Sequence, residues 1–168
     1  MALKVGIVGM RGIGTRHAEC HAGDPLAELV AVCDVIPERA DAVAEKHGAK
    51  AYYKLADMLD GEPDLEIVDV CTGGNENGSW HYEPTMEALQ AGKHVLCEKP
   101  LSNEVREARE MVALAAQKDL YLGCNLNHYF TPPAERAKQY MEEGQVGELI
   151  YCLHKMGFPG GAATYKPL

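Results

Sequence analysis

A short glycine-rich turn near the amino terminus has residue types and spacing that suit anion binding. It follows an apolar run, Leu3 to Val8, and opens a stretch with helical periodicity. Backbone N–H groups at such a strand-to-helix turn, together with the helix dipole, can hold the pyrophosphate of a dinucleotide. The expected contacts are Gly9, Arg11, Gly12, Ile13 and Gly14.

The spacing of this turn departs from the usual G-x-G-x-x-G pattern at its middle position. When Gly9 is taken as the first glycine and Gly14 as the last, Arg11 stands where a glycine would let the backbone approach the phosphates. The Arg11 side chain could crowd that approach, or its guanidinium could pair with the pyrophosphate while Gly12 absorbs the altered turn. On its own the turn is compatible with a dinucleotide site or with a glycine-rich connector that holds no ligand.

A single carboxylate, Asp34, favours the dinucleotide site. It ends the apolar run Leu29 to Cys33 and stands 20 residues after Gly14, where such a group can accept hydrogen bonds from the adenosine ribose. Its charge would repel a 2′-phosphate, so NAD is expected and NADP less so, although Arg39 could be recruited to a phosphate. The alternative role of Asp34 is a helix cap before Pro37.

Short β-rich apolar runs alternate with longer helix-period stretches along most of the chain. This alternation predicts an α/β protein with a doubly wound parallel sheet of the Rossmann type, in strand order 3-2-1-4-5-6. The predicted strands are Leu3 to Val8, Leu29 to Cys33, Ala49 to Tyr53, Ile67 to Cys71, His94 to Cys97 and Tyr121 to Cys124. The predicted helices are Gly12 to Ala22, Pro37 to His47, Leu55 to Leu59, Tyr82 to Ala91 and Asn103 to Lys118, the last capped by Asn103. Ligands bind open parallel sheets at the carboxyl ends of the strands, and the residues expected there after the fourth strand are Thr72, Gly73 and Asn75.

A change of character after Cys124 divides a predicted first domain, residues 1–124, from the beginning of a second one, residues 125–168. A polar and aromatic connection, Asn125 to Pro133, leads to a predicted helix, Ala134 to Glu143, and a predicted strand, Glu148 to Met156. One helix and one strand cannot bury a core unaided. We therefore expect a truncated second α/β domain that packs on the first, pairs with another chain or is partly disordered.

The composition disfavours several classes of partner. The chain has 168 residues and a net charge of -9, which disfavours nucleic acid and anionic membrane surfaces. No apolar run approaches the roughly 20 residues of a membrane span. Met1 leads into a strand-like run without a signal-peptide pattern, so a cytoplasmic protein is expected. The six cysteines form no C-x-x-C pair and are interpreted as mostly small buried hydrophobic residues.

Three side chains of the first predicted helix could share a metal ion. His17, Cys20 and His21 have the i, i+3, i+4 spacing of one helical face. No carboxylate-rich shell is evident near them in the sequence, so an ordinary helix surface without a metal is the favoured interpretation.

The run from Ala91 to Ser102 resembles the A-G-K-H-V-x-x-E-K-P motif of the family of glucose-fructose oxidoreductase, inositol dehydrogenase and MocA. The resemblance extends to the glycine turn, to Cys33-Asp34, to His81-Tyr82-Glu83 and to the stretch from Asn125 to Pro132. It implies a Rossmann domain followed by an α/β domain built on a large open sheet, which forms the sugar or polyol site and a homo-oligomer interface.

Carried over onto the matching positions, the resemblance implies that Lys99 is the catalytic or substrate-orienting lysine. It also implies that Glu98 and Pro100 shape the nicotinamide end of the cofactor pocket. The residue type agrees, because an ammonium group at the carboxyl end of the fifth strand could hydrogen-bond a substrate hydroxyl and stabilise its developing alkoxide. Asn125 and His128 lie in the junction that reaches cofactor and substrate in the family, and His128 is a candidate acid–base group. The family's D-x-x-x-H motif, which supplies its acid–base histidine, has no match in this sequence.

Three hypotheses about function follow. The leading one is the cofactor-binding portion of an NAD-dependent oxidoreductase that acts on a secondary alcohol of a sugar or polyol by hydride transfer. The alternative is a non-catalytic dinucleotide-binding or interaction module without the substrate domain. A third hypothesis, a scaffold that kept the fold and lost the ligand, rests on Arg11.

Overall fold

A computed structural model describes residues 2–153, and the chain divides into two compact units after Leu126. The strands of the first unit are β1 (Leu3–Val8), β2 (Ala27–Cys33), β3 (Lys50–Tyr52), β4 (Ile67–Val70), β5 (His94–Glu98) and β6 (Leu122–Asn125). They form one sheet in the order β3-β2-β1-β4-β5-β6, and every neighbouring pair is parallel. The predicted strand order is confirmed.

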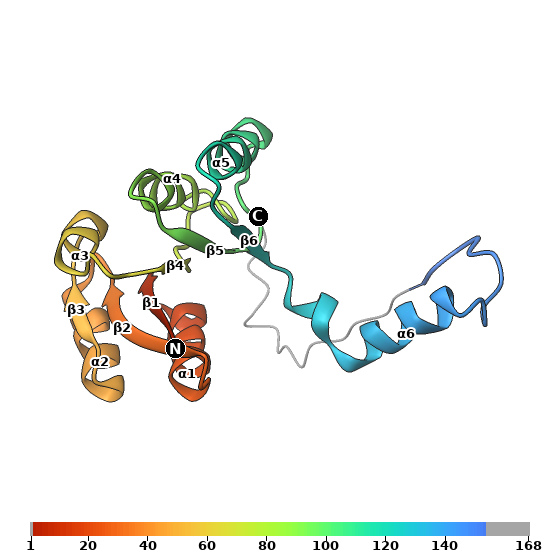
Figure 1. Cartoon of the computed structure of the whole chain (residues 1–168), viewed down its shortest axis with the longest axis horizontal. Coiled ribbons are helices and arrows are strands. Elements are labelled where there is room, and N and C mark those ends of the chain that lie inside the picture. Colours follow the sequence, from red (N-terminus) through yellow and green to blue (C-terminus); the bar gives the residue numbers. More distant parts are fainter. Residues whose placement is uncertain (1, 154–168) are drawn as a thin grey trace. The chain divides into compact units, whose positions relative to one another are not determined.

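Five helices connect these strands and cover both faces of the sheet. They are α1 (Gly12–Gly23), α2 (Pro37–His47), α3 (Leu55–Gly61), α4 (Tyr82–Gln90) and α5 (Val105–Gln117). In Figure 1, α1 and α2 lie on one side of the sheet, and α3, α4 and α5 lie on the other. This arrangement confirms the doubly wound α/β fold of the Rossmann type.

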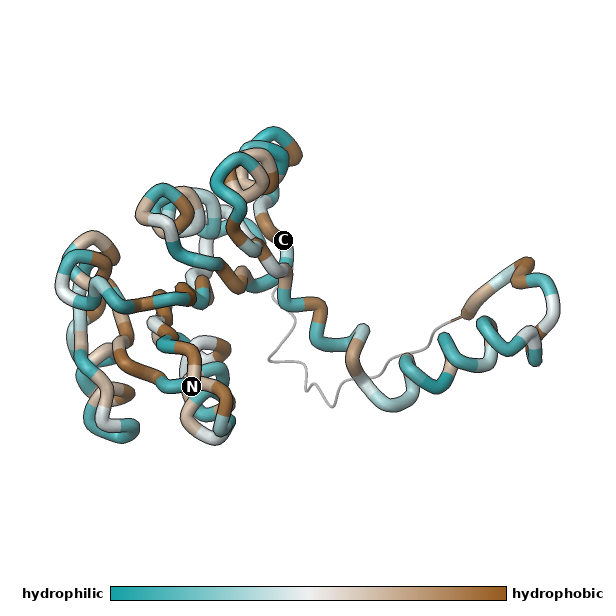
Figure 2. Tube along the Cα trace, viewed as in Figure 1, coloured by the Kyte–Doolittle hydropathy of each residue, from teal (hydrophilic) through white to brown (hydrophobic). Residues whose placement is uncertain are grey.

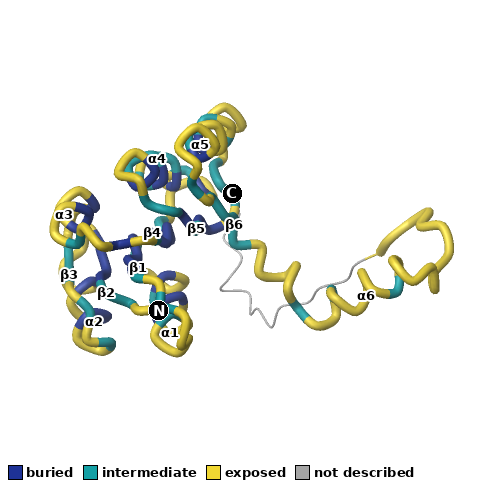
Figure 3. The backbone as a smooth tube through the Cα atoms, in the orientation of Figure 1, coloured by how far each residue is buried: buried dark blue, intermediate teal, exposed yellow. Residues whose placement is uncertain are grey.

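The buried strand residues alternate between the two faces, as the two-residue period of a strand requires. Val32 packs with Val5 and Ile7 in the cluster that also includes residues of α1 and α2. Its neighbours Ala31 and Cys33 pack in a second cluster with residues of α3, α4 and α5. Stretches of β1, β2, β4 and β5 are dark blue in Figure 3, whereas β3 and β6 have no fully buried residue, and brown apolar stretches mark parts of the sheet in Figure 2.

Several strands extend beyond their predicted ends, because strand pairing rather than residue type sets the limits. β2 begins at Ala27, which pairs with Leu3 of β1. β5 and β6 each run one residue further than predicted, and their last residues, Glu98 and Asn125, are partners across the two strands. Two residues implied to lie near the cofactor are therefore neighbours in the sheet.

The helix ends follow the predicted signals with one exception. Pro37 opens α2, and Gly48 ends it in the left-handed conformation with φ of 70°. The prediction that Asn103 caps the next helix is wrong, because α5 begins after Glu104 and has no side-chain cap. The amide of Asn103 instead donates to Glu76 Oε2 at 2.6 Å.

The second unit contains a 3-10 helix, η1 (Asn127–Phe130), and α6 (Pro132–Glu142), neither of which has a buried residue. α6 confirms the predicted helix, but the predicted strand from Glu148 is wrong for residues 148–153, which form no strand. A strand needs a hydrogen-bonded neighbour, and none is present for this segment within residues 2–153. Residues 154–156 of that prediction lie outside the described residues.

No helix in the described part of the chain is long and apolar enough to span a membrane.

Candidate functional site

The two outer glycines of the turn between β1 and α1 are required by the protein's own backbone. Gly9 has φ of 96°, and a Cβ there would lie 2.7 Å from the backbone at Cys71 and Thr72. A Cβ at Gly14 would lie 1.8 Å from the carbonyl oxygen of Gly9. Because neither position has room for a side chain, these glycines fix the path of the turn.

The middle of the same turn is open. A Cβ at Gly12 would meet nothing within 4 Å. Arg11 is the N-cap residue of α1 and provides no side-chain cap, although its carbonyl oxygen accepts from Gly14 at 2.7 Å. Within residues 2–153, no protein acceptor is found for the backbone N–H groups of Gly12 and Ile13. This helix terminus therefore presents free donors and the positive end of its dipole, as an anion site requires.

Asp34 lies beside this turn at the end of β2 and is only 6% exposed. Its Oδ2 accepts from the backbone N–H of Met10 at 2.7 Å, and its Oδ1 accepts from that of Ile36 at 2.9 Å. The Arg39 guanidinium lies 3.9 Å from Oδ1. Asp34 thus joins the glycine turn to the end of β2, while each carboxylate oxygen retains a lone pair for a further donor. It does not cap α2, whose N-cap is Ile36 without a side-chain cap.

The segment after β4 is held by a buried histidine. Thr72 Oγ1 donates to the carbonyl oxygen of Trp80 at 2.6 Å. The ring nitrogens of His81 lie 2.6 Å from the carbonyl oxygens of Thr72 and Pro100, so His81 connects the loop after β4 to the loop after β5. The intervening residues expected near the cofactor, Gly73 and Asn75, are exposed.

Glu98, Lys99 and Pro100 leave the carboxyl end of β5. Glu98 is buried, whereas Lys99 is exposed, and the peptide bond between Lys99 and Pro100 is cis. Glu98 Oε2 accepts from the backbone N–H of Lys99 at 3.2 Å, and Oε1 accepts from Asn125 Nδ2 at 2.6 Å. No side-chain partner of the Lys99 ammonium group is found among residues 2–153, which leaves it available to a ligand.

A buried polar cluster under α1 was missed by the sequence analysis. Its members, called the histidine cluster below, are His17, His21, Asp69, Glu98 and Asn125. His17 Nδ1 and His21 Nε2 both lie 2.8 Å from Asp69 Oδ2. The expectation of an ordinary helix surface without nearby carboxylates is therefore wrong, because Asp69 on β4 and Glu98 on β5 approach from other elements.

The signal for this cluster was an acidic residue inside a buried strand. Asp69 interrupts the apolar run of β4 and is fully buried, and such a carboxylate needs partners. His17, Asp69 and Cys71 each offer one atom of a type that can bind a metal ion, and these three atoms lie within 4.8 Å of one another. The Cys71 Sγ to His17 Nδ1 distance is 3.3 Å and that from Nδ1 to Asp69 is 2.8 Å, which are separations typical of hydrogen bonds. Cys20 is exposed.

The charges in this cluster stabilise one another. The hydrogen bond to Asp69 raises the pKa of His17, and the charge of Glu98 acts in the same direction against the effect of burial. Burial alone would raise the pKa of Asp69, but hydrogen bonds from His17 and His21 outweigh it and lower that pKa. Burial also raises the pKa of the Cys71 thiol, so this thiol is neutral.

The glycine turn, Asp34, the Thr72 loop and Lys99 all follow the carboxyl ends of strands in one sheet. β1 lies between β2 and β4, so the chain order reverses at this point, which is where doubly wound sheets bind ligands. His128 lies in η1 of the second unit and is exposed. Its acid–base role stays a prediction.

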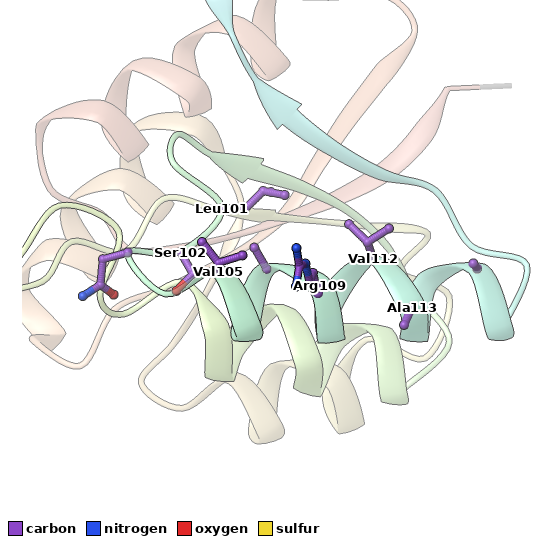
Figure 4. Close-up of a pocket in the computed structure, with 9 residues that line it drawn as sticks. Leu101, Ser102, Val105, Arg109, Val112 and Ala113 are labelled. Atoms are coloured by element: carbon purple, nitrogen blue, oxygen red, sulfur yellow. The ribbon is translucent and has the colours of Figure 1, made fainter.

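An open apolar groove lies elsewhere, along the outer face of α5. Val105, Arg109 and Val112 line it from the helix, and Leu101 and Ser102 line it from the preceding loop (Figure 4). None of the residues expected to bind a cofactor or substrate contributes to this groove.

Residues 3–126 match the model of a family described as an oxidoreductase family with an NAD-binding Rossmann fold. D-glucoside 3-dehydrogenase of Escherichia coli is 34% identical over 99% of this chain and 48% of that protein. Myo-inositol 2-dehydrogenase of Thermotoga maritima is 32% identical over 87% of this chain and 42% of that protein. The chain thus spans less than half the length of these relatives.

Solved structures of dehydrogenases and reductases are similar to this chain over part of their length. The scyllo-inositol dehydrogenase of Lactobacillus casei with bound NAD(H) and scyllo-inositol has a TM-score of 0.79 and 26% identity, over 88% of this chain and 43% of that one. A 3-ketoreductase from Actinomadura kijaniata in complex with NADP has a TM-score of 0.77 and 28% identity, over 86% of this chain and 43% of that one.

Proposed function

Because the chain belongs to the Gfo/Idh/MocA family of oxidoreductases through its NAD-binding Rossmann domain, we propose that it forms the cofactor-binding portion of a sugar or polyol dehydrogenase. The observation that carries this proposal is the shared sheet edge. Three groups follow the ends of β1, β2 and β5: the first N–H groups of α1, the carboxylate of Asp34 and the ammonium group of Lys99, for which no side-chain partner is found within residues 2–153. Donors for a pyrophosphate, an acceptor for a ribose and a donor for a substrate oxygen are thereby present in one domain.

The residues present fit a nicotinamide dinucleotide. The open space at Gly12 and the free N–H groups of Gly12 and Ile13 would receive the pyrophosphate, and Asp34 would accept from the ribose hydroxyls. Asp34 disfavours a 2′-phosphate by charge, so NAD is proposed over NADP, although Arg39 lies close enough to counter part of that charge. When bound, the cofactor supplies the hydride acceptor for alcohol oxidation.

Lys99 is proposed to act on the substrate. Its ammonium group would donate a hydrogen bond to the hydroxyl of a secondary alcohol and stabilise the negative charge that develops on that oxygen. His128, the second residue of the second unit, is the proposed acid–base group. Residues 125–168 are proposed to begin the substrate and oligomerisation domain, and the protein is proposed to be cytoplasmic.

The first experiment measures cofactor binding by this chain. NADH and NADPH are titrated while nicotinamide fluorescence and quenching of Trp80, the single tryptophan, are recorded. We expect saturable binding of NADH and weaker binding of NADPH. Absence of saturable binding to either would contradict the proposal and favour a scaffold that has lost its ligand.

The second experiment assays the protein with a panel of polyols and sugars. Lys99→Ala is compared with Lys93→Ala, which changes the same residue type at the opposite end of β5. We expect Lys99→Ala to lower kcat about a hundredfold or more and to leave the affinity for NADH nearly unchanged. Equal activities of the two variants would exclude the proposed role of Lys99. Binding of NADH without turnover of any substrate would favour a non-catalytic module.

A further inference from the structure

His17 reaches from α1 to two strands through its two ring nitrogens. On one side, Nδ1 lies 2.8 Å from Asp69 Oδ2 on β4. On the other side, Nε2 lies 3.2 Å from Glu98 Oε1 on β5 and 3.1 Å from Asn125 Nδ2 on β6. One buried imidazole therefore contacts side chains from three adjacent strands.

These contacts continue to the residue proposed to act on the substrate. The carboxylate of Glu98 accepts from Asn125 through Oε1 and from the backbone N–H of Lys99 through Oε2. The same carboxylate thus contacts both the Asn125 side chain and the Lys99 backbone. Glu98 is 7% exposed, so water has little access to replace a lost partner.

We propose that His17 is a positioning residue that orients the Glu98 carboxylate and, through it, the backbone at which Lys99 leaves β5. This inference rests on the proposed function of Lys99. It assigns to α1 a second role besides holding the pyrophosphate, because one turn after Gly14 the same helix orients the far side of the site.

The orientation of the Asn125 amide follows from its neighbours. Its Nδ2 lies 2.6 Å from a carboxylate oxygen, so a flipped amide would place two oxygens in contact. With this nitrogen fixed as a donor, the neutral ring of His17 donates through Nδ1 to Asp69 and accepts from Asn125 through Nε2. The imidazolium form donates through Nε2 to Glu98 instead. Protonation of His17 therefore changes which partner its Nε2 contacts.

The groups that face His17 favour its protonated form. Asp69 and Glu98 are the two carboxylates in contact with it, and their combined effect raises its pKa. The Cys71 thiol lies 3.3 Å from Nδ1 and is neutral, and the His21 ring lies 6.5 Å away between centroids. His17 should consequently lose its proton above the ordinary pH range for histidine. This loss should change the hydrogen bonds of Glu98 and the environment of the Lys99 amide.

Nuclear magnetic resonance can test this coupling in the 18.3 kDa chain. With ¹⁵N labelling, the His17 ring nitrogens and the Lys99 backbone amide are followed as a function of pH. We expect both to change with the same midpoint, above 6.5, the ordinary value for histidine. The matched variants are His17→Gln and His21→Gln, because His21 shares Asp69 with His17 but has no hydrogen bond or ion pair with Glu98 among residues 2–153.

His17→Gln should abolish the pH-dependent change at Lys99, and His21→Gln should preserve it. A folded His17→Gln variant whose Lys99 amide still titrates as in the parent would overturn the proposal, as would loss of the effect in both variants. If His17→Gln does not fold, Glu98→Gln decides instead. Removing that carboxylate should lower the His17 midpoint by about one pH unit, and an unchanged midpoint would contradict the contact.

The measurement distinguishes this inference from the proposed function. The pH profile of the Lys99 amide requires no cofactor, so the coupling can hold even if NADH does not bind. Conversely, NADH titration of His17→Gln should change affinity less than threefold, because the side-chain hydrogen bonds of His17 found within residues 2–153 go to neither the glycine turn nor Asp34. An intact NADH site with an uncoupled Lys99 amide would leave the proposed function standing and reject the role of His17.

Discussion

On the β1–β2 side of the sheet, backbone atoms shape the candidate site. Gly9 and Gly14 approach neighbouring backbone so closely that no side chain fits, and Asp34 is held by two backbone N–H groups. On the β4–β6 side, side chains shape it. His17, Glu98 and Asn125 come from three elements and contact one another by their polar ends. The first region tolerates almost no change of residue size, whereas the second depends on charge and hydrogen-bond direction.

Gly14→Ala should have the largest effect. The new Cβ would lie 1.8 Å from the Gly9 carbonyl oxygen, so the turn or α1 must move. We expect the free energy of unfolding, measured by urea denaturation, to fall by about 3 kcal/mol or more. Gly12→Ala is the matched control, since its Cβ meets nothing within 4 Å. It should change stability by about 0.5 kcal/mol or less and weaken NADH binding about tenfold. Equal destabilisation by the two variants would contradict the division between required and open glycines.

Asp34→Asn should have the next largest effect. The amide nitrogen would oppose a backbone N–H group, and the charge that disfavours a 2′-phosphate would be lost. We expect the dissociation constant for NADH to rise about tenfold and the preference for NADH over NADPH to narrow. Asp24→Asn is the control, because Asp24 Oδ1 also accepts from the backbone N–H two residues on, at Leu26. Similar losses of NADH affinity in both variants would indicate a general turn effect rather than a ribose contact.

The pH dependence of stability should reveal the electrostatic character of the histidine cluster. The pKa of His17 is raised, so its stabilising contribution is complete below its ordinary value of 6.5 and is lost as pH rises through the folded value. The pKa of Asp69 is lowered, so its contribution is present above its ordinary value of 3.8 and is lost as pH falls through the folded value. The stability difference between the parent chain and Asp69→Asn should therefore be greatest between these values and decrease by about 1 kcal/mol at higher pH. Urea unfolding across this pH range measures the stability difference. A difference that does not change with pH would exclude an ion pair between His17 and Asp69.

Arg11→Gln should have the smallest effect. The Arg11 side chain is exposed and, within residues 2–153, has no ion-pair partner, so it is free to approach a pyrophosphate beside the start of α1. We expect NADH binding to weaken about threefold at low salt and less at high salt, because the interaction is screened. Tighter binding by the variant would show that Arg11 crowds the cofactor instead.

The regular parts of the fold were predictable because they depend on local properties. The apolar runs of β1 and β2, which are continuously buried toward their carboxyl ends, and the glycine after α2 report constraints that each segment carries in its own sequence. The errors occurred where a distant segment decides the outcome. Asn103 donates to Glu76 instead of capping α5, and residues 148–153 form no strand because a strand requires a neighbour.

For the candidate site, the sequence by itself determined the glycine turn, the position of Asp34 after the second strand and the departure of Lys99 from the fifth. Backbone geometry and strand order fix these features through short-range patterns. Only the tertiary structure revealed the histidine cluster, since His17 meets Asp69 across 52 positions of sequence and Asn125 across 108. No local pattern encodes such contacts, because they exist only once the strands have aligned side by side and α1 has packed against them.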